Sequence, residues 1–315
     1  MRDIVRTIQP PPDKEEERVT TFPSSPPVCT APNPEPGRPR LVAPPGTCDT
    51  HMHLFPTGDR YPLTPARSYS PPPAPLEHYR RVMAALGIAR AVLVQASVHG
   101  TDNAMLLGVL RENPETFRGI AVVDSGATDA ELEALNAAGV RGLRINLLYG
   151  GGVGFSEAQA LNDRVKALGW HFQLLIDVAR FERLGARLAA LDVPVVIDHM
   201  GHMSNGSDLA SPGFRDMLAL LREGRAWVKL SGPYRFSAAP HPPYADTIAL
   251  ARALIEAAPG QLVWATDWPH PALTKPMPED AALLDLLAEW TADPALQRRI
   301  LVNNPARLYG FPSPA

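Results

Sequence analysis

The chain has 315 residues, of which 45% are hydrophobic and 20% charged, a composition typical of an ordinary globular protein. Its net charge of −3 gives no support for binding to nucleic acids or to anionic membranes. Two cysteines provide no disulfide framework, and no segment has the pattern of a secretory signal or a membrane span, so we expect a cytoplasmic protein.

Residues 1–44 differ in composition from the rest of the chain. They contain proline clusters, among them a triple proline at 10–12, an acidic run at 15–17 and few large apolar side chains. A segment of this kind buries too little surface to offset its conformational entropy. We therefore predict a proline-rich disordered leader over 1–44 and one folded domain over 45–315.

Short apolar segments recur from residue 46 onward, with helix-like segments between most of them. The apolar segments predict strands at 46–53, 89–97, 118–124, 140–147, 171–177, 194–200, 226–232 and 262–268. The segments between them predict helices at 76–86, 129–138, 156–168, 180–191, 211–222, 246–258 and 278–289. This alternation is typical of an α/β fold and matches a (β/α)8 TIM barrel in period and in size, roughly 250 residues. A doubly wound open sheet is the alternative, but no Gly-x-Gly-x-x-Gly turn follows the first predicted strand.

Polar residues gather where several of the predicted strands end. In a TIM barrel these carboxyl ends form the active site. The first predicted strand ends in Asp-Thr-His-Met-His, and alternate side chains of a strand share a face, so His51 and His53 point to one spot. His199 ends the sixth predicted strand and Asp267 ends the eighth. We expect these four side chains to converge.

Asp267 is the strongest candidate for a general base. It follows the apolar run Leu-Val-Trp-Ala-Thr, so its protonation is expected to be perturbed, and it can accept a proton from water. His51, His53 and His199 can polarise a carbonyl oxygen, or they can hold a divalent metal together with Asp267. The residues alone leave both roles of the histidines open.

Further polar residues are predicted around the mouth of this site. Arg144 and Arg235 favour an anionic substrate, because arginine binds carboxylates in a bidentate manner, although both could instead brace loops. Hydroxyl, amide and imidazole groups that could orient a substrate come from Tyr69, Ser97, Asn146, Tyr234, His202 and His270.

Five motifs, in this order, resemble those of the amidohydrolase superfamily. They are Gly-Thr-Cys-Asp-Thr-His-Met-His (46–53), Val-Gln-Ala-Ser-Val-His-Gly-Thr-Asp-Asn (94–103), Arg-Gly-Leu-Arg-Ile-Asn (141–146), Val-Ile-Asp-His-Met-Gly (196–201) and Trp-Ala-Thr-Asp-Trp-Pro-His-Pro (264–271). The sequence is most similar to the branch that contains 2-pyrone-4,6-dicarboxylate lactonase, over residues 46–311.

This resemblance implies a distorted barrel that hydrolyses a lactone. Asp267 would activate water, and His51, His53 and His199 would polarise the lactone carbonyl. The lactonase resembled here needs no divalent metal, whereas other members of the superfamily do. Because the fifth-strand histidine of many metal-dependent members is replaced here by Leu175, we expect no required cofactor, with a single Zn or Mn as the alternative.

Departures from that branch bear on the substrate. Gly150 and His202 stand where the dicarboxylate enzyme has arginines, and Leu175 stands where it has a tyrosine. We therefore expect a lactone with one carboxylate and a more apolar body, and no nucleic-acid or membrane partner. A metal-dependent decarboxylase, a sugar-lactone isomerase and a non-catalytic barrel that binds a small acid are the alternatives.

Overall fold

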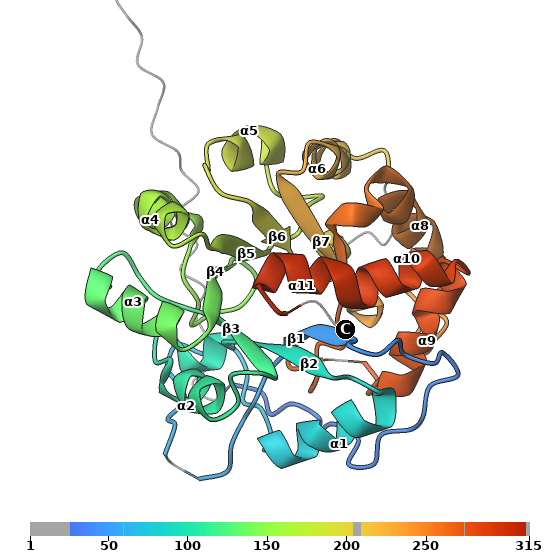
Figure 1. The fold of residues 1–315 in the computed structure, drawn as a ribbon, viewed down its shortest axis with the longest axis horizontal. Coiled ribbons are helices and arrows are strands. Elements are labelled where there is room, and N and C mark those ends of the chain that lie inside the picture. The colour runs from blue at the N-terminus through green and yellow to red at the C-terminus, as the bar shows by residue number, and fades with distance from the viewer. Residues whose placement is uncertain (1–25, 59, 204–208, 274, 313–315) are drawn as a thin grey trace, which may run out of the picture.

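The computed structural model describes residues 26–58, 60–203, 209–273 and 275–312 (Figure 1). Its eight strands form one parallel sheet in which each strand pairs with the next along the chain, in the order β1 to β8. They are β1 (Cys48–Met52), β2 (Arg90–Val94), β3 (Phe117–Ala121), β4 (Val140–Asn146), β5 (His171–Leu175), β6 (Val195–Ile197), β7 (Ala226–Leu230) and β8 (Leu262–Trp264). Seven of them lie within a predicted segment, and β3 begins one residue before the segment predicted at 118–124; the predicted (β/α)8 barrel is confirmed.

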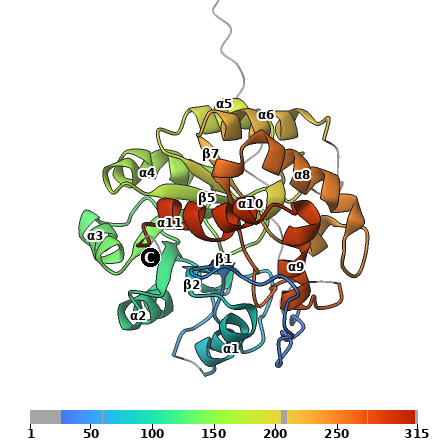
Figure 2. The ribbon, with the colours of Figure 1, turned by 45° about the vertical axis from the view of Figure 1, so that its right-hand side comes forward.

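Helices surround the strands in both views of the ribbon (Figures 1 and 2). They are α1 (Leu76–Leu86), α2 (Ala104–Glu112), α3 (Asp129–Ala137), α4 (Phe155–Ala167), α5 (Leu184–Ala189), α6 (Pro212–Arg222), α7 (Pro233–Phe236), α8 (Ile248–Ala257), α9 (Asp280–Trp290), α10 (Pro294–Arg298) and α11 (Asn304–Tyr309). The seven predicted helices are present, although α5 covers only the central part of 180–191. Helix α2 was not predicted, and it buries Met105, Leu106 and Leu110.

The barrel closes between β1 and the residues that follow β8. The backbone N–H of Asp267 donates to the carbonyl of His51 at 2.9 Å, and the N–H of His53 donates to the carbonyl of Trp268 at 2.8 Å. Met52 and Trp268 form a parallel bridge at the same point. This closure brings the end of the first strand and the residues after the last strand into direct contact.

The two ends of the barrel differ in chemistry. The α11 region packs Tyr309 and Phe311 against Cys48, Val92 and Ile120 in a buried apolar cluster, and the ring of Phe311 lies over Arg90 and Arg118, at the amino ends of β2 and β3. The polar strand ends therefore lie at the opposite, carboxyl end of the barrel. Among the described residues, no helix combines the length and the apolar character that a membrane crossing requires.

Part of the predicted leader contacts the barrel in a defined way. Residues 1–25 lie outside the described residues, but the N–H of Cys29 donates to the carbonyl of Ser70 at 2.9 Å. Further along, the amides of Arg40 and Leu41 both donate to Asp285 on α9, at 2.7 and 2.8 Å. The expectation of disorder is therefore wrong for 26–44, because carboxylates of the barrel bind the backbone N–H groups of a segment that has few apolar side chains of its own.

Candidate active site

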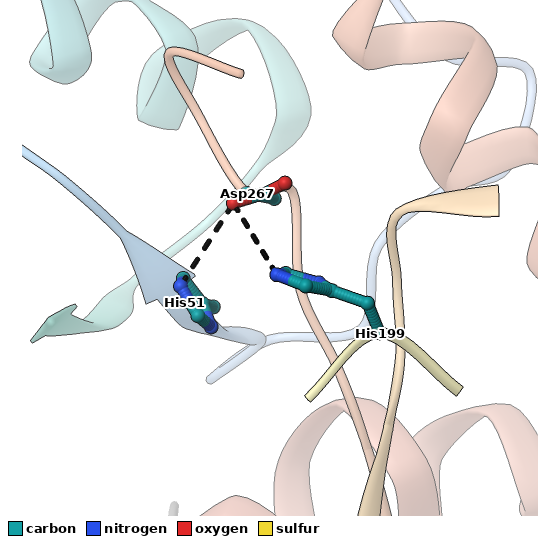
Figure 3. A group of neighbouring side chains, drawn as sticks. All are labelled: His51, His199 and Asp267. Carbon is teal, nitrogen blue, oxygen red and sulfur yellow. Dashed lines mark ion pairs between the residues drawn. The ribbon is translucent and has the colours of Figure 1, made fainter. Parts of the chain in front are cut away.

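His51, His199 and Asp267 converge at the carboxyl end of the barrel (Figure 3). His51 belongs to β1, His199 follows β6, and Asp267 follows β8. Oδ1 of Asp267 lies 3.8 Å from Nε2 of His51, 3.8 Å from Nε2 of His53 and 3.7 Å from Nε2 of His199. The predicted convergence of these four side chains is thus present in the structure.

Two of these residues have a backbone conformation that is uncommon outside glycine. φ is 49° at His199 and 66° at Asp267. The neighbouring hydrogen bonds hold Asp267 in this conformation, because its N–H donates to His51 and its carbonyl accepts from the N–H of His270 at 2.7 Å. Backbone strain of this kind is concentrated at functional sites, where the surrounding structure maintains it.

The two oxygens of Asp267 have different surroundings. Oδ2 accepts hydrogen bonds from Nε of Arg235 and from the hydroxyl of Tyr234, both at 2.7 Å, whereas Oδ1 has no hydrogen-bond partner among the described residues. Burial raises the pKa of this carboxyl, but the Arg235 guanidinium and, to a smaller extent, the neighbouring histidines together outweigh burial and hold the pKa well below its usual range. Asp267 is therefore an ionised carboxylate with one free oxygen.

The histidines around that free oxygen are neutral. Burial lowers the pKa of both His53 and His199 to about 3, and burial together with Lys229 lowers that of His51 well below its ordinary value. Nδ1 of His53 lies 2.7 Å from the carbonyl of Val94, which can only accept. His53 therefore carries its proton on Nδ1 and presents the lone pair of Nε2 to the site.

A buried polar network contacts Nδ1 of His51. Nζ of Lys229 donates to Oε1 of Gln173 at 2.7 Å and to the carbonyl of Thr50 at 2.8 Å, and it lies 3.2 Å from Nδ1 of His51. Asp198 lies 3.4 Å from this Nζ and 3.2 Å from the same Nδ1. The sequence analysis did not predict a role for Lys229 or Gln173. A lysine within the apolar run Ala-Trp-Val-Lys-Leu is unusual enough to have indicated Lys229.

A small cavity lies above this cluster. Its volume is about 10 Å³, and it is lined by His53, Tyr69, Ser97, Arg144, Asn146, Tyr149, Leu175, His199, Arg235, Asp267 and Pro271. Nε of Arg144 and Nδ2 of Asn146 are buried donors without a hydrogen-bond partner among the described residues. Together with Oδ1 of Asp267, they leave two donors and one acceptor free for a bound molecule. Tyr149 and Pro271 are lining residues that the sequence did not indicate.

The other predicted substrate-binding residues lie further from the cavity. Tyr234 lies behind Asp267, with its hydroxyl 2.8 Å from Nδ1 of His270, and Nε2 of His270 lies 3.1 Å from Asp280. These residues hold the carboxylate from behind, whereas they were expected to face a substrate. His202 is half-buried, and burial and the nearby Arg235 lower its pKa.

The residues present fit a divalent metal. One ligand atom each from His51, His199 and Asp267 lies within 4.8 Å of the others, and all three side chains are buried. Oδ1 of Asp267 is an orphaned acceptor, and neutral imidazoles with carboxylate are the donor set that Zn prefers. In this structure the predicted fourth ligand, His53, lies beside the group, with Nε2 3.1 Å from Nε2 of His51.

The barrel and its histidine–carboxylate cluster define a TIM-barrel enzyme with a hydrolytic type of centre. Residues 48–311 match the model of the amidohydrolase family. The chain belongs to this family.

Three relatives cover nearly the whole chain. The 4-sulfomuconolactone hydrolase of Hydrogenophaga intermedia is 36% identical over 290 residues, 90% of this chain and 95% of the relative. The 2-pyrone-4,6-dicarboxylate hydrolase of Comamonas testosteroni is 35% identical over 87% of this chain and 93% of its own length. The D-galactarolactone isomerase of Agrobacterium fabrum is also 35% identical, over 89% and 94%. A solved apo structure from Agrobacterium tumefaciens, 34% identical, covers 88% of this chain and 100% of its own, with a TM-score of 0.81.

Proposed function

We propose that this protein hydrolyses the ring of a small lactone that carries a carboxylate. The observation that carries the proposal is the free Oδ1 of the ionised Asp267, a residue that lines a cavity of the size of about one water molecule. The relatives named as lactone hydrolases support the lactone as substrate class. Two unpartnered donors on Arg144 and Asn146 support the carboxylate.

The chain's own residues supply each proton transfer. Water bound at Oδ1 of Asp267 attacks the lactone carbonyl carbon and gives its proton to the carboxylate. His199 stabilises the resulting oxyanion, with Nε2 as donor when the hydroxyl of Ser231, 2.9 Å from Nδ1, donates to the ring. The bond between the carbonyl carbon and the ring oxygen then breaks, and Asp267 returns the proton to that oxygen. The product has one new carboxyl group and one new hydroxyl group.

We propose further that this reaction requires no metal. Leu175 supplies no ligand at the end of β5, and the guanidinium of Arg235 already neutralises Asp267 and opposes a second cation beside it. A metal held by His51, His199 and Asp267 would instead polarise the carbonyl and acidify water. Elemental analysis and assays before and after chelation test this point, and one equivalent of Zn or Mn with activity lost on chelation would contradict it.

The decisive assay is lactone turnover in ¹⁸O-labelled water. Hydrolysis places ¹⁸O in the product carboxyl, isomerisation to another lactone incorporates none, and decarboxylation releases CO₂. We expect ¹⁸O incorporation, and we expect Asp267→Asn to lower kcat/KM by about 10²–10⁴-fold. Asp124→Asn, an exposed carboxylate beyond β3, is the matched control and should retain activity. Incorporation of no label, or an Asp267→Asn variant as active as the control, would refute the proposal.

The expected preference for one carboxylate is tested separately. Leu175 lines the cavity and offers no hydrogen bond, which supports a substrate with an apolar body. A monocarboxylate lactone should be turned over faster than 2-pyrone-4,6-dicarboxylate. Equal or faster turnover of the dicarboxylate would contradict the substrate preference and leave the lactonase function intact.

A further inference from the structure

The cavity is too small for the substrate proposed above. The cavity has a volume of about 10 Å³ and so holds about one water molecule. A carboxylated lactone is several times larger than a water molecule. The floor of the cavity, with Asp267 and the histidines, is fixed by the barrel closure and by buried hydrogen bonds. Part of the roof must therefore move before a substrate can enter.

One segment of the roof has the features of a movable cover. Residues 147–154 connect β4 to α4, and they include four glycines, at positions 150, 151, 152 and 154. Tyr149 from this segment lines the cavity, is half-buried and meets the ring of Tyr69 edge-on at 5.9 Å between centroids. Leu147 is 41% exposed, an unusual exposure for a large apolar side chain in this protein.

The segment lies so close to the end of β2 that a side chain would not fit. At Gly151, φ is +88°, and a Cβ there would lie 2.4 Å from the carbonyl oxygen of Ser97 and 3.0 Å from Thr64. Ser97 also lines the cavity. The closed position of the segment therefore depends on Gly151, both for its backbone angle and for its close approach to the wall of the site.

Asn146 holds the segment in this position. The side-chain Oδ1 of Asn146 accepts hydrogen bonds from the backbone N–H groups of Leu148 and Tyr149, both at 3.0 Å. The backbone N–H of Asn146 donates to the carbonyl of Val153 at 3.1 Å. Nδ2 of the same side chain is buried and unpartnered on a cavity-lining residue. A substrate oxygen bound there would contact the side chain that fixes the cover.

We propose that residues 147–154 are a lid that opens to admit the substrate and then places Tyr149 against its ring, so that Tyr149 is a substrate-contacting residue. This inference rests on the proposed lactonase function for the identity of the ligand. An aromatic side chain suits an unsaturated, planar lactone ring better than a saturated sugar lactone. Tyr149 therefore contributes to substrate selection as well as to closure.

Two variants with a matched control test the lid. Gly151→Ala should keep the lid from closing, since it adds both strain at positive φ and a clash. Gly224→Ala adds comparable strain, with φ +73° and no atom within 4 Å of the new Cβ, between α6 and β7 at the opposite end of the barrel. The first measurement is carbethoxylation of His53 by diethyl pyrocarbonate, followed by mass spectrometry, which needs no turnover. Gly151→Ala should react about tenfold faster than the wild type, and Gly224→Ala should match the wild type.

The second measurement is steady-state kinetics of Tyr149 variants. Tyr149→Ala should raise KM for an unsaturated lactone about three- to tenfold, and Tyr149→Phe should restore most of this loss because it keeps the ring. Equal carbethoxylation rates in wild type and Gly151→Ala would overturn the lid, and an unchanged KM in Tyr149→Ala would overturn the contact with the ring. Gated carbethoxylation without turnover of any lactone would instead refute the lactonase function and leave the lid standing.

Discussion

Replacing Arg235 with methionine should move the acid limb of the activity profile to higher pH. In the structure, Nε and Nη2 of Arg235 lie 2.7 and 2.5 Å from Oδ2 of Asp267, and the two side chains are only 6% and 1% exposed. Removing one partner of a buried ion pair costs about 3–5 kcal/mol. Part of this cost appears as a higher pKa of Asp267, because a buried carboxylate without its cation favours the protonated form.

The direction of the shift follows from the charge. Arg235 stabilises the carboxylate, so its removal favours the protonated form, and the base is lost at a higher pH. The stability effect has the same origin: Asp267, with a folded-state pKa below its unfolded value, stabilises the fold fully above about pH 4 and loses this contribution as the pH falls through the folded-state value. Arg235→Met should therefore be destabilised at pH 7, with a smaller difference from wild type in acid.

The assay is kcat/KM against pH for wild type, Arg235→Met and Arg235→Lys. Because Arg235 lines the cavity, both variants can bind substrate more weakly, so only the position of the acid limb reports on Asp267. Arg235→Lys keeps the positive charge, so the acid limb of its pH profile should stay close to that of the wild type. An Arg235→Met limb that coincides with the wild-type limb would refute the assignment of Asp267 as the base that Arg235 keeps ionised.

Two further predictions concern buried polar groups. Tyr234→Phe removes a hydrogen bond to the charged Asp267 and should lower the free energy of unfolding by about 1.5–3 kcal/mol in urea denaturation. Tyr244→Phe is the control, because the buried hydroxyl of Tyr244 has no partner among the described residues. An equal loss of unfolding free energy in both variants would contradict the role of the bond between Tyr234 and Asp267. Burial lowers the pKa of Lys229 from 10.5 to about 8. Between pH 8 and 10.5 the unfolded chain therefore binds more protons than the folded chain, and the free energy of unfolding should rise by about 3 kcal/mol over this range. Lys229→Met should lack this rise, and a variant with the wild-type pH dependence would show that Lys229 is not its source.

The sequence determined the barrel and the membership of its histidine–carboxylate cluster. Alternating apolar segments and helices fix the (β/α)8 order, because each strand must bury its side chains and each helix must cover it. The His-x-His spacing fixed the shared direction of His51 and His53, and position at a strand end marked His199 and Asp267. These inferences are local or depend only on the rule that parallel strands end on one side.

Tertiary packing decided how those residues act on one another. Closure of β1 against the residues after β8 brings Asp267 to the histidines. Arg235 was predicted to bind an anionic substrate or to brace a loop, and in the folded chain it donates a hydrogen bond to the carboxylate of Asp267. Tyr234 lies behind the same carboxylate for the same reason. No spacing rule specifies contacts between residues more than thirty positions apart, since these depend on loop paths and side-chain packing.

The same limit applies to the leader and to the roof of the site. Composition predicted disorder up to residue 44, but the N–H groups of Arg40 and Leu41 bind a carboxylate on α9 that is distant in sequence. The four glycines between residues 150 and 154 specify no conformation by themselves, and the role of this segment follows from the approach of Gly151 to Ser97 and from the cavity of about 10 Å³ beneath it. The sequence thus determined which groups are available for chemistry, and the tertiary structure decided their protonation, their partners and their access to a substrate, because those properties depend on burial and distance.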